Sequence, residues 1–213
     1  MSPIVLVIIA VTCIVSYMGL NNAVMFEKYK FSVSAINNRK EYFRLISSAF
    51  LHADFMHLFF NMLSLYFFQG AVILFFGNIG FLILYFGSMI LGNLFSLLIY
   101  KNQPWYSAIG ASGAVSGIIF ASIAMAPNEI NVNFLPGWLF GTLYFSYSVY
   151  MMLNPNRNDN IGHSAHLGGA FFGLIYAVAN QPQAAIENSM YLGIMSLPLI
   201  YLGYEIFVRK RIG

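Results

Sequence analysis

The sequence predicts an all-α integral membrane protein, and its composition and charge pattern support this prediction. Of the 213 residues, 59% are hydrophobic and 8% are charged, whereas a soluble domain carries about 25% charged residues. Three stretches, 55–100, 102–128 and 130–156, contain no Asp, Glu, Lys or Arg. Each stretch can hold at least one helix of the roughly 20 residues that a bilayer requires. A lipid bilayer is therefore the expected solvent for most of the chain.

Seven apolar segments are candidates for membrane-spanning helices: 3–20, 55–76, 79–100, 112–126, 136–153, 164–180 and 190–208. The first resembles a retained helix more than a signal peptide, because it lacks a basic leading region. The sequence GNIG at 77–80 separates the second segment from the third. The fourth segment is short, so extra turns or burial within the protein must cover its ends. We expect one membrane domain that covers residues 1–213.

The connection at 21–54 is long and carries more charged residues than any other connection. Loops longer than about 15 residues usually carry structure or function. The stretch at 41–57 mixes aromatic and apolar residues with few charges, so we expect it to lie partly in the membrane interface. A second loop, PNEINVNFLPG at 127–137, contains the Gly and Asn residues that permit motion.

The rest of the composition argues against several classes of protein. The single cysteine, Cys13, excludes an intrachain disulfide and a thiolate metal cluster. The net charge of +3 comes with no basic stripe, so we expect no nucleic-acid partner. The chain contains no H-E-x-x-H sequence, and Asp54 and Asp159 both fall in predicted loops. We therefore expect no metal, no cofactor and no aspartyl-protease chemistry.

Four polar residues lie near the starts of three predicted helices that open toward the same side of the membrane. Ser112 begins the fourth helix and His166 lies near the start of the sixth. His57 and Asn61 are four residues apart near the start of the second helix, so they share one face. Polar groups at membrane depth are costly and often functional. We expect these four side chains to lie at a similar depth, below one membrane surface.

This combination is the one that peptide hydrolysis needs. Ser112 could supply a nucleophile and His166 a base, while His57 and Asn61 could donate hydrogen bonds to an oxyanion, together with the backbone N–H of Ser112. Two G-x-x-x-G sequences, at 113–117 and 169–173, would let the fourth and sixth helices approach closely. Each motif alone also fits a plain packing role, and only their conjunction favours catalysis.

Three stretches of the sequence resemble the rhomboid family of intramembrane serine proteases. They are FRLISSAFLHADFMHLFFNM, SAIGASGAVSG and GHSAHLGGAFFG, and they occur in the family's order over roughly residues 40–180. The resemblance implies a rhomboid-like six-helix core with a serine–histidine dyad and no third triad member. Segment 190–208 would then be an additional C-terminal seventh transmembrane helix, although Pro198 and Glu205 argue against a full span.

The resemblance also implies roles for individual residues. Ser112 is the expected nucleophile and His166 the expected general base, with His163 as the alternative base one turn earlier. His57 and Asn61 are the expected oxyanion residues. The supporting residues are Gly110 in the turn before the serine, Gly113 on the helix-packing face, and Arg44 as the cation that anchors the first loop. His52 matches a common histidine of the family's first loop, for which we expect a structural role.

Three positions depart from the family's pattern. Phe43 precedes Arg44 where the family has Trp-Arg, which keeps the anchoring cation. Some members carry a tyrosine that stacks on the histidine four residues after the serine, but this chain has Ser116 there. Another group must therefore hold the imidazole. Some members also carry a glutamate deep in the second helix, where this chain has Ile73.

The sequence thus predicts a serine endopeptidase that cuts transmembrane proteins within or beside their membrane segment, with the lipid bilayer as its other partner. Two alternatives remain open: a catalytically silent rhomboid-like protein that binds membrane clients, and a small transporter or channel. Labelling by a serine-reactive fluorophosphonate would separate the protease from both. The sequence does not indicate an oligomeric state.

The expected membrane orientation rests on two conflicting arguments. With seven spans, all ten Lys and Arg fall on the face that carries the predicted active site, and the positive-inside rule would place this face in the cytoplasm. The family resemblance implies the opposite. We follow the family and expect a bacterial cytoplasmic membrane with the active site open to the extracytoplasmic side.

Overall fold

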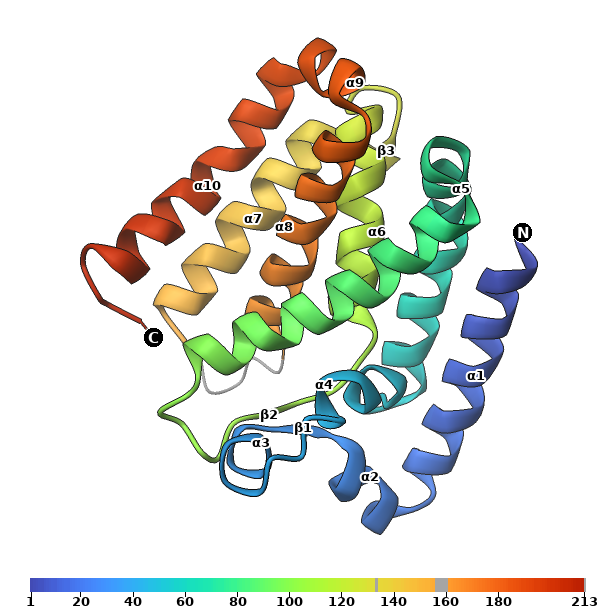
Figure 1. The fold of residues 1–213 in the computed structure, drawn as a ribbon, viewed down its shortest axis with the longest axis vertical. Coiled ribbons are helices and arrows are strands. Elements are labelled where there is room, and N and C mark those ends of the chain that lie inside the picture. Colours follow the sequence, from blue (N-terminus) through green and yellow to red (C-terminus); the bar gives the residue numbers. More distant parts are fainter. Residues whose placement is uncertain (133, 156–160, 213) are drawn as a thin grey trace.

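The computed structural model describes residues 1–132, 134–155 and 161–212, which form a bundle of helices (Figure 1). The helices are α1 (Pro3–Leu20), α2 (Ala23–Tyr29), α3 (Val33–Arg39), α4 (Arg44–Ser47), the 3-10 helix η1 (Ser48–Phe50), α5 (Phe55–Ile99), α6 (Ser112–Met125), α7 (Gly137–Leu153), α8 (His163–Asn180), α9 (Pro182–Glu187) and α10 (Ser189–Phe207). Two short antiparallel pairs join β1 (Phe31–Ser32) to β2 (Ser107–Ala108) and β3 (Asn131–Val132) to β4 (Leu135–Pro136).

Helix α5 comprises two helical segments that are broken at one glycine. Gly77 has φ 69° and ψ −177°, a conformation that glycine reaches without steric cost. In Figure 1 the teal half of α5 rises to this break and the green half returns beside α6. The prediction of separate helices at 55–76 and 79–100 is therefore confirmed.

Among the residues that the structure describes, three helices, α1, α5 and α10, are long and apolar enough to cross a membrane. Helix α10 accommodates Pro198 in its interior, so the residue does not prevent the predicted seventh helix from forming. Helix α6 has only 14 residues, but almost all of them are buried. Burial against neighbouring helices compensates for its length, as predicted. The sequence did not predict the short helix α9, which begins at Pro182, a residue whose fixed φ suits a first helical position.

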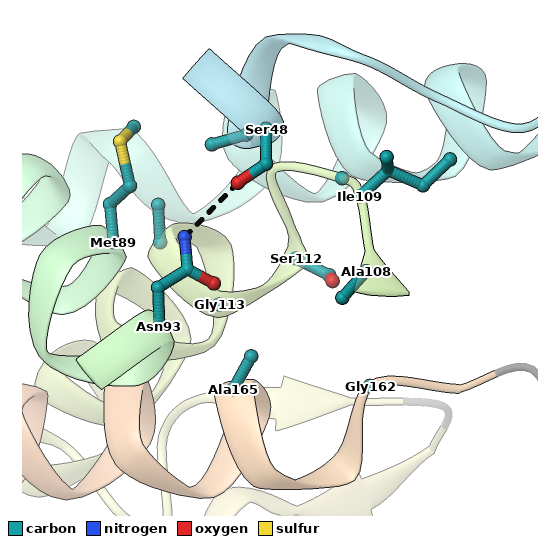
Figure 2. A pocket seen from close by; sticks show the side chains of 12 residues that line it. Ser48, Met89, Asn93, Ala108, Ile109, Ser112, Gly113, Gly162 and Ala165 are labelled. Carbon is teal, nitrogen blue, oxygen red and sulfur yellow. Dashed lines mark hydrogen bonds between the residues drawn. The ribbon is translucent and has the colours of Figure 1, made fainter. Parts of the chain in front are cut away.

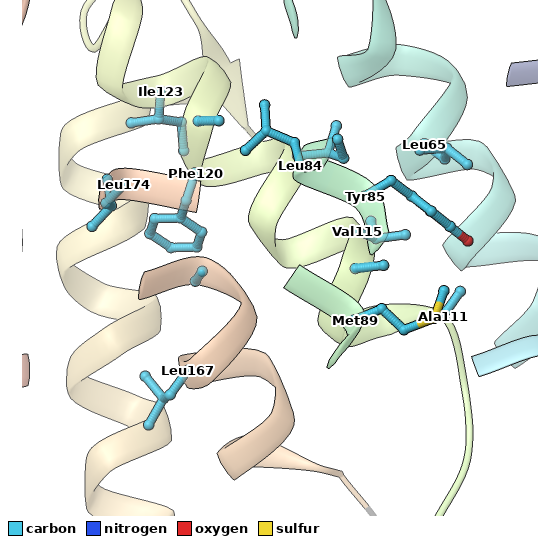
Figure 3. Close-up of a cluster of buried hydrophobic side chains, with 14 of the residues drawn as sticks. Leu65, Leu84, Tyr85, Met89, Ala111, Val115, Phe120, Ile123, Leu167 and Leu174 are labelled. Carbon is cyan, nitrogen blue, oxygen red and sulfur yellow. The ribbon is translucent and has the colours of Figure 1, made fainter. Parts of the chain in front are cut away.

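Helices α6 and α8 cross at the small-residue faces that the sequence predicted. A Cβ atom on Gly169 would overlap the carbonyl oxygen of Gly113, and one on Gly173 would overlap that of Gly117. The backbones of the two helices are thus in direct contact, which only glycine permits here. Apolar side chains fill the space around this crossing, as Figure 3 shows for a buried cluster that includes Tyr85 of α5.

The first loop is structured, as expected, and Arg44 lies at its centre. Its side chain is buried: Nε donates to Glu41 Oε2 at 2.6 Å, and Nη1 donates to the carbonyl oxygens of Glu27 and Lys30 at 2.9 and 2.7 Å. Hydrogen bonds from Arg39, then from Arg44, lower the pKa of Glu41 to about 2. Because Glu27 of α2 and Lys30, the residue that follows α2, are both tied to α4 in this way, Arg44 fits the expected role of a loop anchor.

One end of the bundle collects the first loop, the start of α6, the start of α8 and the C-terminal tail (Figure 1). The connection from α5 to β2, whose sequence includes Lys101, and the tail after α10, whose sequence includes Arg209–Arg211, also lie at this end (Figure 1). Helix α9 and the β3–β4 hairpin lie at the other end. Arg157 and Asp159, which belong to the connection between the predicted helices at 136–153 and 164–180, fall outside the described residues. We call this end the mouth of the bundle.

We expect Gly169→Ala to lower the free energy of unfolding by about 1–3 kcal/mol, because overpacking a tight contact costs this much. The new methyl group would force the backbones of α6 and α8 apart. Unfolding in a mixed detergent–denaturant titration measures the effect. Gly193→Ala in α10 is the matched control, since a Cβ there meets no atom within 4 Å. An equal loss of stability in both variants would contradict the packing role of the crossing.

Candidate active site

Ser112 is the first residue of α6, and a tight turn leads into it (Figure 2). Gly110 has φ +112°, which side-chain-bearing residues rarely adopt, and a Cβ there would lie 2.8 Å from Cε1 and Nε2 of His57. The turn therefore needs glycine for two reasons: its backbone conformation and its closeness to the His57 ring. Gly110 thus has the turn-shaping position that the sequence suggested.

Ser112 and His166 lie in contact. The distance from Ser112 Oγ to His166 Nε2 is 2.6 Å, within reach of a direct hydrogen bond between a hydroxyl and an imidazole. His166 belongs to the first turns of α8, and both side chains are partly exposed at the mouth. The close crossing of α6 and α8 brings these two helix starts together. The predicted pairing of a nucleophile with a base is therefore geometrically feasible.

His57 lies beside the Ser112 turn, and Asn61 follows it one helical turn later on the same face of α5. Asp54 caps the helix by accepting a hydrogen bond from the backbone N–H of His57 at 2.8 Å. The Asn61 side chain is buried, and its Nδ2 donates to the His57 carbonyl oxygen at 3.0 Å. A side-chain amide has two donor hydrogens, so this bond leaves Asn61 a second one.

His163, the alternative base, lies against α7. Its Nδ1 is 3.2 Å from Ser148 Oγ, and its ring meets that of Tyr147 edge to face at 5.5 Å between centroids. The side chain is buried, unlike that of His166. This geometry favours His166 over His163 as the partner of Ser112.

Tyr144 of α7 is a neighbour of the site that sequence reasoning missed. Its ring is stacked against the His166 ring, with centroids 6.3 Å apart and an interplanar angle of 21°. Its hydroxyl lies 3.2 Å from Ser116 Oγ. Tyr144 is thus a group that can hold the imidazole in place of the tyrosine that the resemblance led us to seek at Ser116. Tyr144 and Ser148 are one turn apart, but the sequence could not show which face of α7 meets α8.

A small cavity adjoins Ser112 and is drawn in Figure 2. It measures about 20 Å³, and its lining includes Ser48, Asn93, Gly113 and Ala165. Asn93 Nδ2 donates to the Leu45 carbonyl oxygen at 2.8 Å and to Ser48 Oγ at 3.3 Å. A polar cavity of this size can hold one water molecule.

Comparison with known proteins identifies the family that this chain resembles. A family model described as the Rhomboid domain matches residues 39–182. YdcA, a rhomboid-type protein of Bacillus subtilis (strain 168), is 33% identical over 138 residues, which are 63% of this chain and 65% of YdcA. Rhomboid protease GluP of the same organism is 29% identical over 168 residues, 77% of this chain and 31% of GluP.

Not every relative is named as a protease. Inactive RHOMBOID-like protein 8 of Arabidopsis thaliana is 31% identical over 122 residues, which are 51% of this chain and 35% of that protein. This chain spans less than two thirds of the length of each of these relatives. Since the family model covers more than half of the chain, and the fold and motifs agree with it, the chain is an integral membrane protein that belongs to the rhomboid family.

Proposed function

We propose that this chain is an intramembrane serine endopeptidase that cuts transmembrane proteins within or beside their membrane segment. The observation that carries the proposal is the 2.6 Å contact between Ser112 Oγ and His166 Nε2 at the mouth of the bundle. A serine hydroxyl is a weak nucleophile on its own, and a base within hydrogen-bond distance activates it.

In the first half of the proposed reaction, Ser112 Oγ attacks the scissile carbonyl carbon while its proton passes to His166 Nε2. The carbonyl oxygen gains negative charge, which three donors can stabilise: the backbone N–H of Ser112, the His57 ring and the second N–H of Asn61. The Ser112 N–H lies at the N-terminus of α6, where backbone donors have no partner within the helix. His166 then gives the proton to the leaving amine as the C–N bond breaks.

In the second half, a water molecule attacks the carbonyl carbon of the substrate acyl group that is now bound to Ser112 Oγ, and it gives a proton to His166. The ester bond breaks and the proton returns to Ser112 Oγ, which restores the starting state. Stacking on Tyr144 would hold the His166 ring in one orientation through both halves. The cavity beside Ser112 offers room for the water that the second half consumes.

The proposed substrate is a single-span membrane protein. A substrate helix must unwind locally before its carbonyl can reach Ser112, because intrahelical hydrogen bonds shield it. Residues of low helix propensity near the cut should favour this step. We place the protein in a bacterial cytoplasmic membrane with the mouth on the extracytoplasmic side. The buried contacts of Arg44 weaken the opposing charge argument at this residue, since a cation held within a folded loop is not a simple topological anchor.

Fluorophosphonate labelling tests the proposed function directly. We expect the unmodified protein to be labelled and Ser112→Ala to be unlabelled, with cleavage of a membrane reporter substrate lower by about 10³-fold or more, since removing a nucleophile has effects of this size or larger. Ser122→Ala is the control, because Ser122 is a buried serine near the other end of α6. Full activity of Ser112→Ala would exclude the mechanism, and an unlabelled, inactive wild type would favour a client-binding protein.

The assignment of the base can be tested with the two histidines of α8. We expect His166→Ala to be as inactive as Ser112→Ala, and the double variant to be little worse, because a dyad acts as a unit. His163→Ala should retain most of the turnover, since its ring contacts α7. Initial rates on the reporter substrate measure both. A reversal of the two phenotypes would move the base to His163.

The oxyanion donors should have graded effects. We expect His57→Ala and Asn61→Ala each to lower kcat by up to about 10²–10³-fold, the usual effect of losing one such donor. KM should change little, because the donors act on charge that develops in the transition state. If both variants turned over at the unmodified rate, these residues would be limited to packing roles.

A further inference from the structure

A chain of hydrogen bonds links α1 to the turn before Ser112 through His52. The backbone N–H of Ala111 donates to His52 Nε2 at 3.3 Å. On the other side of the ring, His52 Nδ1 lies 2.7 Å from Ser16 Oγ, and Ser16 Oγ donates to the Phe50 carbonyl oxygen at 2.8 Å. Ser16, His52 and Ala111 are each 0% exposed. This series of hydrogen bonds thus joins α1, the first loop and the turn before α6, which are distant from one another in sequence.

The partners of His52 determine its protonation. A backbone N–H can only donate, so His52 Nε2 must be unprotonated to accept from Ala111. The neutral ring then carries its hydrogen on Nδ1 and donates it to Ser16 Oγ, whose own hydrogen goes to Phe50. Burial, and secondarily the nearby His57, lower the pKa of His52 to about 3, against an opposing effect of Asp54. The ring therefore stays neutral at physiological pH. Its Nε2 is always the acceptor from Ala111 and its Nδ1 always the donor to Ser16.

The Ala111 bond acts on the turn that presents the nucleophile. Ala111 is the residue before Ser112 and caps α6. The preceding N–H, that of Gly110, donates to the Ser48 carbonyl oxygen at 3.0 Å. Two successive N–H groups are thus fixed on the first loop. The next one, that of Ser112, is the proposed oxyanion donor, and a turn with two fixed peptides has little freedom to reorient the third.

We propose that His52 is a positioning residue for Ser112: it holds the Ala111 peptide, and its bond to Ser16 connects this hold to α1. The catalytic part of this inference rests on the proposed function. Ser16 lies before the segment 39–182 that matches the family model, so the inference assigns a role in the site to a helix outside that segment.

Two isosteres of His52 separate the two bonds. In His52→Gln the side-chain oxygen can reach the position of Nε2 and accept from Ala111, but nothing replaces Nδ1. In His52→Asn the side-chain N–H can replace Nδ1 toward Ser16, but nothing reaches Ala111. We expect His52→Asn to lose about 10²-fold in kcat, the scale on which misplaced catalytic groups lose rate, while His52→Gln stays within about tenfold of the unmodified protein.

The readouts include one that a merely structural role would not change. KM should stay within about threefold in both variants, and the fluorophosphonate labelling rate should fall in parallel with kcat. Ser16→Ala should lie between the unmodified protein and His52→Asn, with Ser122→Ala as the matched buried control. Equal activities of His52→Asn and His52→Gln would overturn the proposal. It would also be overturned if the loss of kcat across the variants correlated with their loss of thermal stability and not with the loss of the hydrogen bond to Ala111.

Nitrogen-15 NMR of histidine-labelled protein tests the inference independently of activity. We expect His52 to show the neutral tautomer with hydrogen on Nδ1, unchanged between about pH 5 and 8, in both the unmodified protein and Ser112→Ala. A hydrogen on Nε2, or titration in this range, would overturn the assignment. A wild-type protein that is never labelled by fluorophosphonate would instead count against the proposed function, and the NMR result would still decide the tautomer.

Discussion

The backbone contact between α6 and α8 is the constraint on which the rest of the structure depends. Side chains on Gly113 and Gly117 of α6, or on Gly169 and Gly173 of α8, would keep the helices apart. Without a hydrophobic driving force between helices in lipid, such close packing is a main source of their association. The same contact brings the starts of both helices together, and it thereby sets the distance between Ser112 and His166. Packing and the candidate site thus share one cause.

Much of the helix pattern could be predicted because lipid imposes simple requirements on sequence. Charge-free runs located the helices, and GNIG located the break at Gly77, since both signals are local. The pairing of Ser112 with His166 also followed, because alternating spans fix which helix starts share a side. Tyr144 and the partners of His52 could not be predicted in this way. They depend on the rotation of α7 and on the path of the first loop, which tertiary packing decides.

Helix α7 has a larger part in the geometry of the site than its apolar sequence suggests. Its Tyr144 stacks on His166 and bonds Ser116, while Ser148 and Tyr147 contact His163 one turn away. An aromatic ring can lie against an imidazole from any helix that is close enough, so the position of the ring in the sequence need not be conserved for the contact to exist. Any displacement of α7 would change the surroundings of both histidines together.

Many of the buried polar groups lie near the mouth, where polar partners and water are available. An unpaired polar group in an apolar medium costs several kcal/mol, so polar networks are favoured where their members are hydrogen-bonded or near water. Asn93, Ser96, Ser164 and His52 lie in such networks, close to the first loop and the starts of α6 and α8. The first loop supplies many of the acceptors, including the carbonyls of Leu45, Ser48 and Phe50. The loop therefore does more than connect α1 to α5: it provides the polar surface on which a serine turn can be held rigidly inside an otherwise apolar bundle.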